Sequence, residues 1–168
     1  MFKKAKCVSA ENLILPPTTL REACYRALFS WATYLETAPA IPATTLATYC
    51  CWYMFERTAI TTAPDLLAET LVKQCYGGMF NYCTRLNYIK CTATSGFSTS
   101  QCLNAWVANV ASSGTFVKDV DVQIASGSWT IGANGIPTNW LVYDNMAVAS
   151  PEITYDGFDT ITITCDTA

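Results

Sequence analysis

Residues 115–124 read TFVKDVDVQI, and the periodicity of the sequence changes at this stretch. From Asp119 to Ile124 polar and apolar side chains alternate, which is the pattern of a β-strand with one buried and one wet face. Residues 160–165 alternate in the same way, and two short apolar segments lie between, at 128–131 and 140–143. This C-terminal part is therefore predicted to form a small antiparallel sheet.

Upstream of this stretch the spacing is that of helices. Thr19 and Glu22 form a capping box, and apolar side chains then recur at steps of three and four residues as far as Leu35. Further helical segments are predicted over about 44–57, over 62–90 with an interruption at Gly77-Gly78, and over 98–113.

The predicted fold class is therefore α+β. An N-terminal helical region, residues 1–114 with about four helices, precedes a β-rich region, residues 115–168, with an antiparallel sheet of about four strands. The two regions are expected to pack as one compact unit, and no internal repeat is recognised.

The chain has few charges and they are unevenly placed. Charged residues make up 14% of the 168 residues, against about 25% in an ordinary soluble domain. Residues 1–90 carry nine cations and six anions, whereas residues 91–168 carry Lys118 and seven anions. Such a separation of positive from negative charge along the chain favours head-to-tail contacts between copies. A sheet that simply presents aspartates to solvent is an equal alternative.

Long uncharged stretches predict surfaces that meet other proteins, because interface cores are poor in charge and rich in aromatic residues. The candidate interface residues are the aromatics of the C-terminal region, Trp129, Trp140, Tyr143, Tyr155 and Phe158. We therefore expect a structural, non-enzymatic subunit of a symmetric multi-copy assembly, most concretely a component of a virus or phage particle such as a head decoration, a connector or a tail part. A monomer with a surface of Ser, Thr and Asn is the alternative.

The cysteines point to a reducing compartment at synthesis. Nine cysteines are an odd number, and none of their spacings is the close pair that a structural zinc site uses. They are expected to be free thiols that pack as small apolar side chains. Lys3, Lys4 and Lys6 are not followed by the apolar run of a signal peptide, and at most they form an arm that touches nucleic acid.

Enzymatic chemistry is not expected, and no cofactor is predicted. The chain has no histidine, and the one cysteine placed at a predicted helix start, Cys102, is the only candidate nucleophile. The second hypothesis is a β-rich recognition module. It would stack a sugar on Trp129 and Trp140, or bind Ca²⁺ through oxygen ligands at one end of the sheet, namely Asp119, Asp121, Asp144, Asn145, Asp156 and Asp159.

Overall fold

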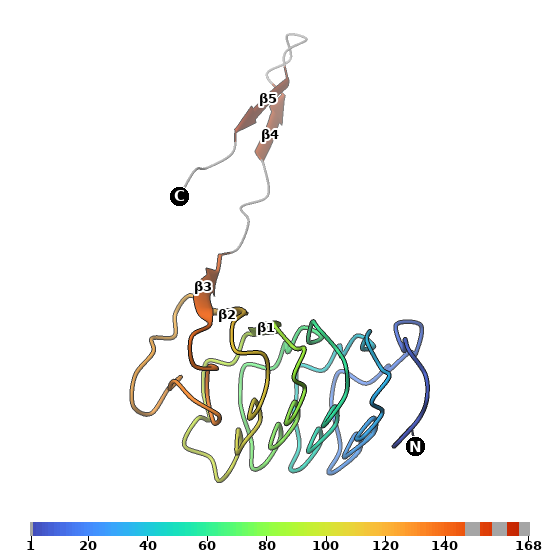
Figure 1. Cartoon of the computed structure of the whole chain (residues 1–168). Helices are drawn as coiled ribbons and strands as arrows, with labels where there is room; N and C mark the ends of the chain where they lie inside the picture. Colours follow the sequence, from blue (N-terminus) through green and yellow to red (C-terminus); the bar gives the residue numbers. More distant parts are fainter. Residues whose placement is uncertain (1, 147–151, 156–160, 165–168) are drawn as a thin grey trace.

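The protein is a solenoid in which successive coils of the chain stack side by side (Figure 1). This computed structural model describes residues 2–146, 152–155 and 161–164. Backbone bridges between neighbouring coils join residues 25 to 28 positions apart, from Ser9–Thr37 to Thr115–Leu141. We number the coils by this register: coil 1 is 15–40, coil 2 is 41–65, coil 3 is 66–90 and coil 4 is 91–114.

A parallel sheet runs along one edge of the stack. It consists of β1 (Tyr88–Cys91), β2 (Thr115–Asp119) and β3 (Leu141–Asn145), in that order. Each strand comes from a different coil, so the sheet is parallel because the coils all run in the same direction. A separate antiparallel pair, β4 (Glu152–Tyr155) and β5 (Ile161–Thr164), follows.

Each coil returns through a run of consecutive turns. Within these runs the backbone N–H groups alternate between two acceptors. The N–H of Leu28 donates to the carbonyl of Tyr25, three residues back (3.1 Å), and the N–H of Phe29 donates to the carbonyl of Met54 in coil 2 (2.8 Å). Phe55 in turn donates to Met79 of coil 3 (2.9 Å). Backbone hydrogen bonds therefore join the turns of neighbouring coils, as they join the neighbouring strands of a sheet.

The turn runs place every fourth residue in the left-handed region. In coil 2 the residues are Tyr49, Tyr53 and Arg57, with φ between 54° and 58°. Such a backbone costs about 1–2 kcal/mol for a residue with a Cβ. The bonds to both neighbouring coils offset this cost, so a single coil is not expected to hold this shape alone.

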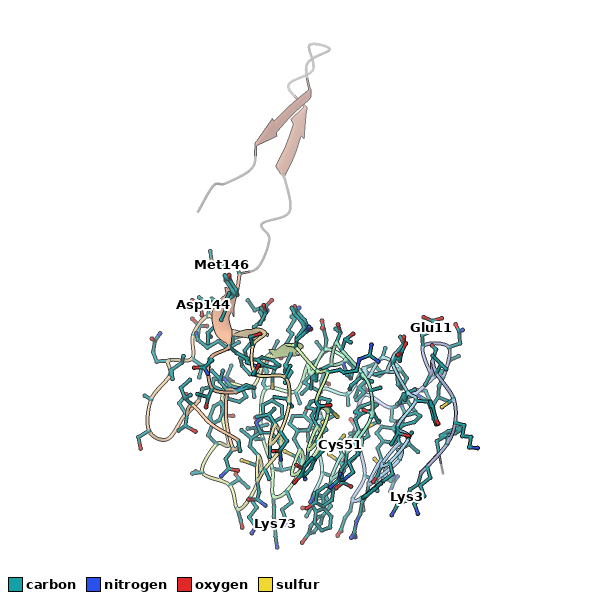
Figure 2. All side chains as sticks on the ribbon, viewed as in Figure 1. Lys3, Glu11, Cys51, Lys73, Asp144 and Met146 are labelled. Atoms are coloured by element: carbon teal, nitrogen blue, oxygen red, sulfur yellow. The ribbon has the colours of Figure 1, made fainter. Side chains whose placement is uncertain are left out.

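The core is a column of aromatic rings along the stack. Phe29, Phe55 and Phe80 occupy equivalent positions in coils 1 to 3, with ring centroids 5.4 and 5.9 Å apart and nearly parallel planes. Trp106 continues the column 6.0 Å beyond Phe80 and packs against Trp129 at 5.9 Å. These rings are buried, and Cys51 lies among the stacked coils (Figure 2).

The predicted helical region is wrong, because residues 2–114 contain no helix. The error has a physical cause. A run of four-residue turns buries one apolar side chain every four residues, and this is also the spacing of an apolar stripe on a helix. Leu20 and Leu35 of the predicted stripe are buried in coil 1. Cys24 and Trp31 of the same stripe are exposed, and Phe29 and Ala32 fill the core in their place.

The predicted four-stranded antiparallel sheet is also wrong. The three-stranded sheet is parallel, and β1 lies within the region predicted to be helical. Segment 128–131 forms no strand, whereas β3 and β5 overlap two predicted segments, 140–143 and 160–165. The stack also continues across residue 114, since β1 pairs with β2.

The chain does contain an internal repeat, contrary to the sequence prediction. Coils 1 to 3 carry the same short pattern, in which a cysteine is followed four residues later by Leu or Met and then by Phe: Cys24–Phe29, Cys50–Phe55 and Cys75–Phe80. A repeat of 20 to 50 residues is the usual signature of a solenoid.

Candidate interaction surface

The two tryptophans predicted to lie at an interface are in the core of this chain. Trp129 is fully buried and packs edge-on against Phe97 and Phe116, at 4.9 and 5.0 Å. Trp140 is 6% exposed and donates its indole N–H to the carbonyl of Ala111 (2.8 Å). Neither ring is available at the surface as a contact residue or as a platform for a sugar.

Of the remaining predicted interface residues, Tyr143 is the one whose side chain the structure describes. It lies on β3 and is 55% exposed, near Met146, which is exposed as well. The side chain of Tyr155 and all of Phe158 lie outside the described residues. The interface assignment of these three residues stays a prediction.

A different set of aromatic residues lies at the surface, on the turn runs of coils 1 to 3. We call it the aromatic–arginine face: Trp31, Tyr49, Trp52, Tyr53, Arg57 and Tyr82. Trp31 and Tyr82 are 43% and 42% exposed, and the other four are partly exposed. Trp, Tyr and Arg are the residue types most enriched among the binding hot spots of protein interfaces.

The repeat explains why these residues share one surface. Trp31, Arg57 and Tyr82 occupy equivalent positions of coils 1, 2 and 3. The backbone N–H of Trp31 donates to the carbonyl of Glu56, the residue before Arg57. The N–H of Arg57 donates to the carbonyl of Asn81, the residue before Tyr82. All three have left-handed φ values, from 58° to 63°. The left-handed turn therefore directs the side chain at this position of each coil outward, so that the three side chains form one row.

Arg57 is held between two rings of this row. Its guanidinium carbon lies 4.4 Å from the ring centroid of Trp31 and 4.0 Å from that of Tyr82. Cation–π contacts of this kind contribute about 0.5–2 kcal/mol each, depending on how dry the site is. The long side chain is therefore fixed in direction before any partner arrives, which lowers the entropy cost of binding.

Two glycines make room for the rest of the face. A Cβ on Gly77 would lie 3.1 Å from Cδ1 of Trp52, and one on Gly78 would overlap the ring of Tyr53. The two rings therefore lie against the backbone of coil 3. Trp52 also contacts Tyr49, at 5.2 Å between centroids, and Arg26, 4.4 Å from the ring. The face therefore contains a second aromatic cluster, Tyr49, Trp52 and Tyr53, with the guanidinium of Arg26 on Trp52.

Cys102, the candidate nucleophile, lacks the environment that would activate its thiol. Cys102 does not start a helix, and burial raises the pKa of its thiol. Burial also raises the pKa of Cys83 to about 11 and that of Cys91 to about 12. These thiols are protonated at neutral pH and pack as apolar groups. Cys24 is the exposed cysteine of the described part of the chain, and no disulfide forms there.

A cleft of about 520 Å³ lies beside Cys102. It is lined by uncharged side chains of coil 4 and of the loop that follows β2, among them Phe97, Gln101, Asn104, Ser128 and Asn134. Two of its amides are already engaged: Gln101 accepts from Gln74 (2.5 Å), and Asn134 accepts from the backbone of Ala105 (2.7 Å). The cleft therefore has uncharged walls, and nothing in it points to one particular ligand.

The proposed Ca²⁺ ligands do not converge within residues 2–146. Asp144 pairs with Lys118, and Asp119 accepts the backbone N–H of Asp121 (3.0 Å). No group of three or more acidic or cysteine side chains in the described residues could hold a metal ion. Asp156 and Asp159 lie outside those residues.

Among the described residues no helix is long and apolar enough to cross a membrane. No known family model matches the chain, and no curated protein or solved structure shows significant similarity to it.

Sequence reasoning missed the aromatic–arginine face because it placed Trp31 and Trp52 on helices. Trp31 was predicted to belong to a buried stripe, and Trp52 to a helix buried on all sides. The repeat could have located Trp31, since alignment of coils 1 to 3 separates the buried Phe29, Phe55 and Phe80 from the residues two positions later, which are Trp31, Arg57 and Tyr82.

Proposed function

We propose that the protein is a structural, non-enzymatic subunit of a multi-copy assembly, and that the aromatic–arginine face is its principal contact surface. The observation that carries this proposal is the Trp31–Arg57–Tyr82 stack on the outside of a regular solenoid. A rigid scaffold that presents Trp, Tyr and Arg side chains without covering them is suited to binding another protein.

The composition supports the same proposal. Residues 91–117 and 122–143 contain no charged side chain, so a large part of the surface is uncharged. The Lys3, Lys4 and Lys6 side chains are exposed and carry no ion pair within the described residues, which leaves residues 1–90 with a net positive surface. A component of a virus or phage particle is the most concrete form of the proposal, and it rests on the sequence alone.

Light scattering coupled to size-exclusion chromatography tests this function. The wild-type chain should elute with a mass that is a multiple of 18.4 kDa. Trp52→Ala should shift the mass toward that of the monomer. Ile14→Ala is the matched control, because Ile14 is 81% exposed and lies outside the aromatic–arginine face. A wild-type mass of one chain at all concentrations up to the highest soluble one would end the proposal.

A further inference from the structure

Arg57 has the geometry of a carboxylate-binding group without a carboxylate. Within the described residues its guanidinium takes part in no ion pair, and its Nε is buried without a hydrogen-bond partner. Because Nε is buried, a partner can reach Arg57 only through the two terminal amino groups of the guanidinium, which form no ion pair among the described residues.

The stack also restricts how that acceptor can approach. Because Trp31 and Tyr82 cover both faces of the guanidinium, only its edge remains for hydrogen bonding. A planar guanidinium approached along its edge forms two parallel N–H···O bonds with a carboxylate. The site is therefore shaped for an acidic side chain that arrives in the plane of the guanidinium.

Two acidic residues of the same coils have other partners. Glu56 accepts a hydrogen bond from the hydroxyl of Ser30 (2.9 Å), and Glu36 pairs with Arg85 (2.6 Å). Neither forms an ion pair with Arg57, so a carboxylate from another part of the chain or from another molecule can occupy its edge.

The C-terminal segment 147–168 has the matching charge. Its sequence contains four carboxylates and no Lys or Arg: Glu152, Asp156, Asp159 and Asp166. The aromatic–arginine face is bordered by Arg26 and Arg57, neither of which has an ionic partner among the described residues. Opposite charges of this kind steer association and fix which surfaces meet.

A contact between copies is the form of this contact that agrees with the proposed assembly. The segment follows Met146, which lies with Asp144 at the sheet edge of the stack, whereas Lys73 lies at the opposite edge (Figure 2). Tyr49 of the face donates its backbone N–H to the carbonyl of Lys73 (3.2 Å), so this end of the face is remote from Met146.

We propose that residues 147–168 of one copy dock on the aromatic–arginine face of the next, with one of their carboxylates on the edge of Arg57. This inference rests on the proposed function, and it names the partner of that surface as a second copy of the chain. Such a contact is heterologous, so it can be repeated from copy to copy and closes into a ring or extends as a filament.

Two full-length variants test it by light scattering. In the face variant, Arg57→Gln, the edge loses its charge. In the tail variant, Glu152→Gln, Asp156→Asn, Asp159→Asn and Asp166→Asn are combined. Each variant alone should associate about tenfold or more weakly than the wild type. Mixed together, the two should form a one-to-one dimer, because the intact tail of the face variant can dock on the intact face of the tail variant.

Arg85→Gln is the control for the loss of a surface cation, since Arg85 already has a carboxylate partner. Arg57→Lys keeps the charge but loses the planar edge, and it should weaken association nearly as much as Arg57→Gln. A synthetic peptide of residues 147–168 should inhibit assembly of the wild type, whereas the same peptide with its four acids replaced by amides should not.

The outcomes separate the two proposals. If the wild type assembles and the face and tail variants assemble equally well, the tail contact is wrong and the assembly function stands. If the tail variant assembles normally but Arg57→Gln does not, the carboxylate comes from elsewhere and the inference is wrong. A wild type that is monomeric contradicts the assembly itself.

Discussion

The tryptophans of the two halves of the solenoid are used in opposite ways. In coils 1 and 2, Trp31 and Trp52 lie at the surface and stack on arginines. In coil 4 and the following loop, Trp106, Trp129 and Trp140 are buried, and two of them donate their indole N–H to backbone carbonyls. A small phenylalanine column fills the first coils, whereas larger rings fill the last ones.

This difference teaches that composition alone does not tell which aromatic residues a repeat protein exposes. In the C-terminal part Trp129 packs into the core against Trp106 and Phe116, so its low charge does not mean that this ring is exposed. The N-terminal half has more charge, yet it leaves Trp31 and Trp52 at the surface. The comparison can be tested by substitutions in each half.

The largest effect is expected from the buried tryptophans. Trp106→Ala should lower the free energy of unfolding by about 3–5 kcal/mol, because it removes a ring packed against four others and a hydrogen bond to Gly135 (2.7 Å). Trp31→Ala should cost under about 1.5 kcal/mol, since its ring is partly exposed. Urea denaturation measures both. Equal losses would show that the two rings are equally buried.

Alkaline pH should weaken the core next. Thiols ordinarily titrate near pH 9, and burial raises the pKa of Cys83 to about 11 and of Cys91 to about 12. The unfolded chain therefore loses these protons first as the pH rises. Their contribution to stability is complete below about pH 9 and is lost from there up to about pH 12, by on the order of 1.4 kcal/mol per thiol and pH unit.

Denaturation midpoints measured from pH 8 to 11 check this slope. Cys91→Ala should show a shallower decline than the wild type, because it removes one of the titrating groups. A wild-type midpoint that stays constant across this range would contradict the burial of the thiols.

A smaller effect is expected where Tyr53 lies over coil 3. Gly78 and Gly127 both have left-handed φ values, 61° and 84°, but only at Gly78 would a Cβ overlap a side chain, the ring of Tyr53. Gly78→Ala should therefore cost about 1–2 kcal/mol more than Gly127→Ala in thermal unfolding. Equal costs would mean that the ring of Tyr53 does not rest on coil 3.

The smallest effect is expected at the Arg85–Glu36 pair. Both side chains are about half exposed, and surface ion pairs contribute about 0–1 kcal/mol. Glu36→Gln should change the unfolding midpoint by no more than this, and the difference should shrink in 0.5 M salt. A larger loss would indicate that the pair holds coils 1 and 3 together.

The sequence allowed some local features of the fold to be predicted. The strands at 141–145 and 161–164 follow from their apolar character and period of two. Leu20 and Leu35 of coil 1 were also identified as core residues, but Cys24 and Trp31 of the same predicted stripe are exposed. The backbone was predicted wrongly, because runs of four-residue turns and helices both repeat apolar side chains every three to four residues.

The candidate surface could not be predicted from single segments. Arg57 meets Trp31 and Tyr82 only because the coils stack in register, 25 or 26 residues apart. If the same residues are interpreted as helices, nothing in the sequence places Trp31 and Tyr82 beside Arg57. Aligning the chain with itself is the step that would have brought the three side chains together.

Oxidative footprinting of the five tryptophans, read by mass spectrometry, tests the central claim most directly. Assembled and dissociated fractions of the full chain would be compared. Trp31 and Trp52 should oxidise in the dissociated fraction and become protected in the assembled one, while Trp106, Trp129 and Trp140 stay protected in both. Equal oxidation of Trp31 and Trp52 in the two fractions would contradict the aromatic–arginine face as the contact surface.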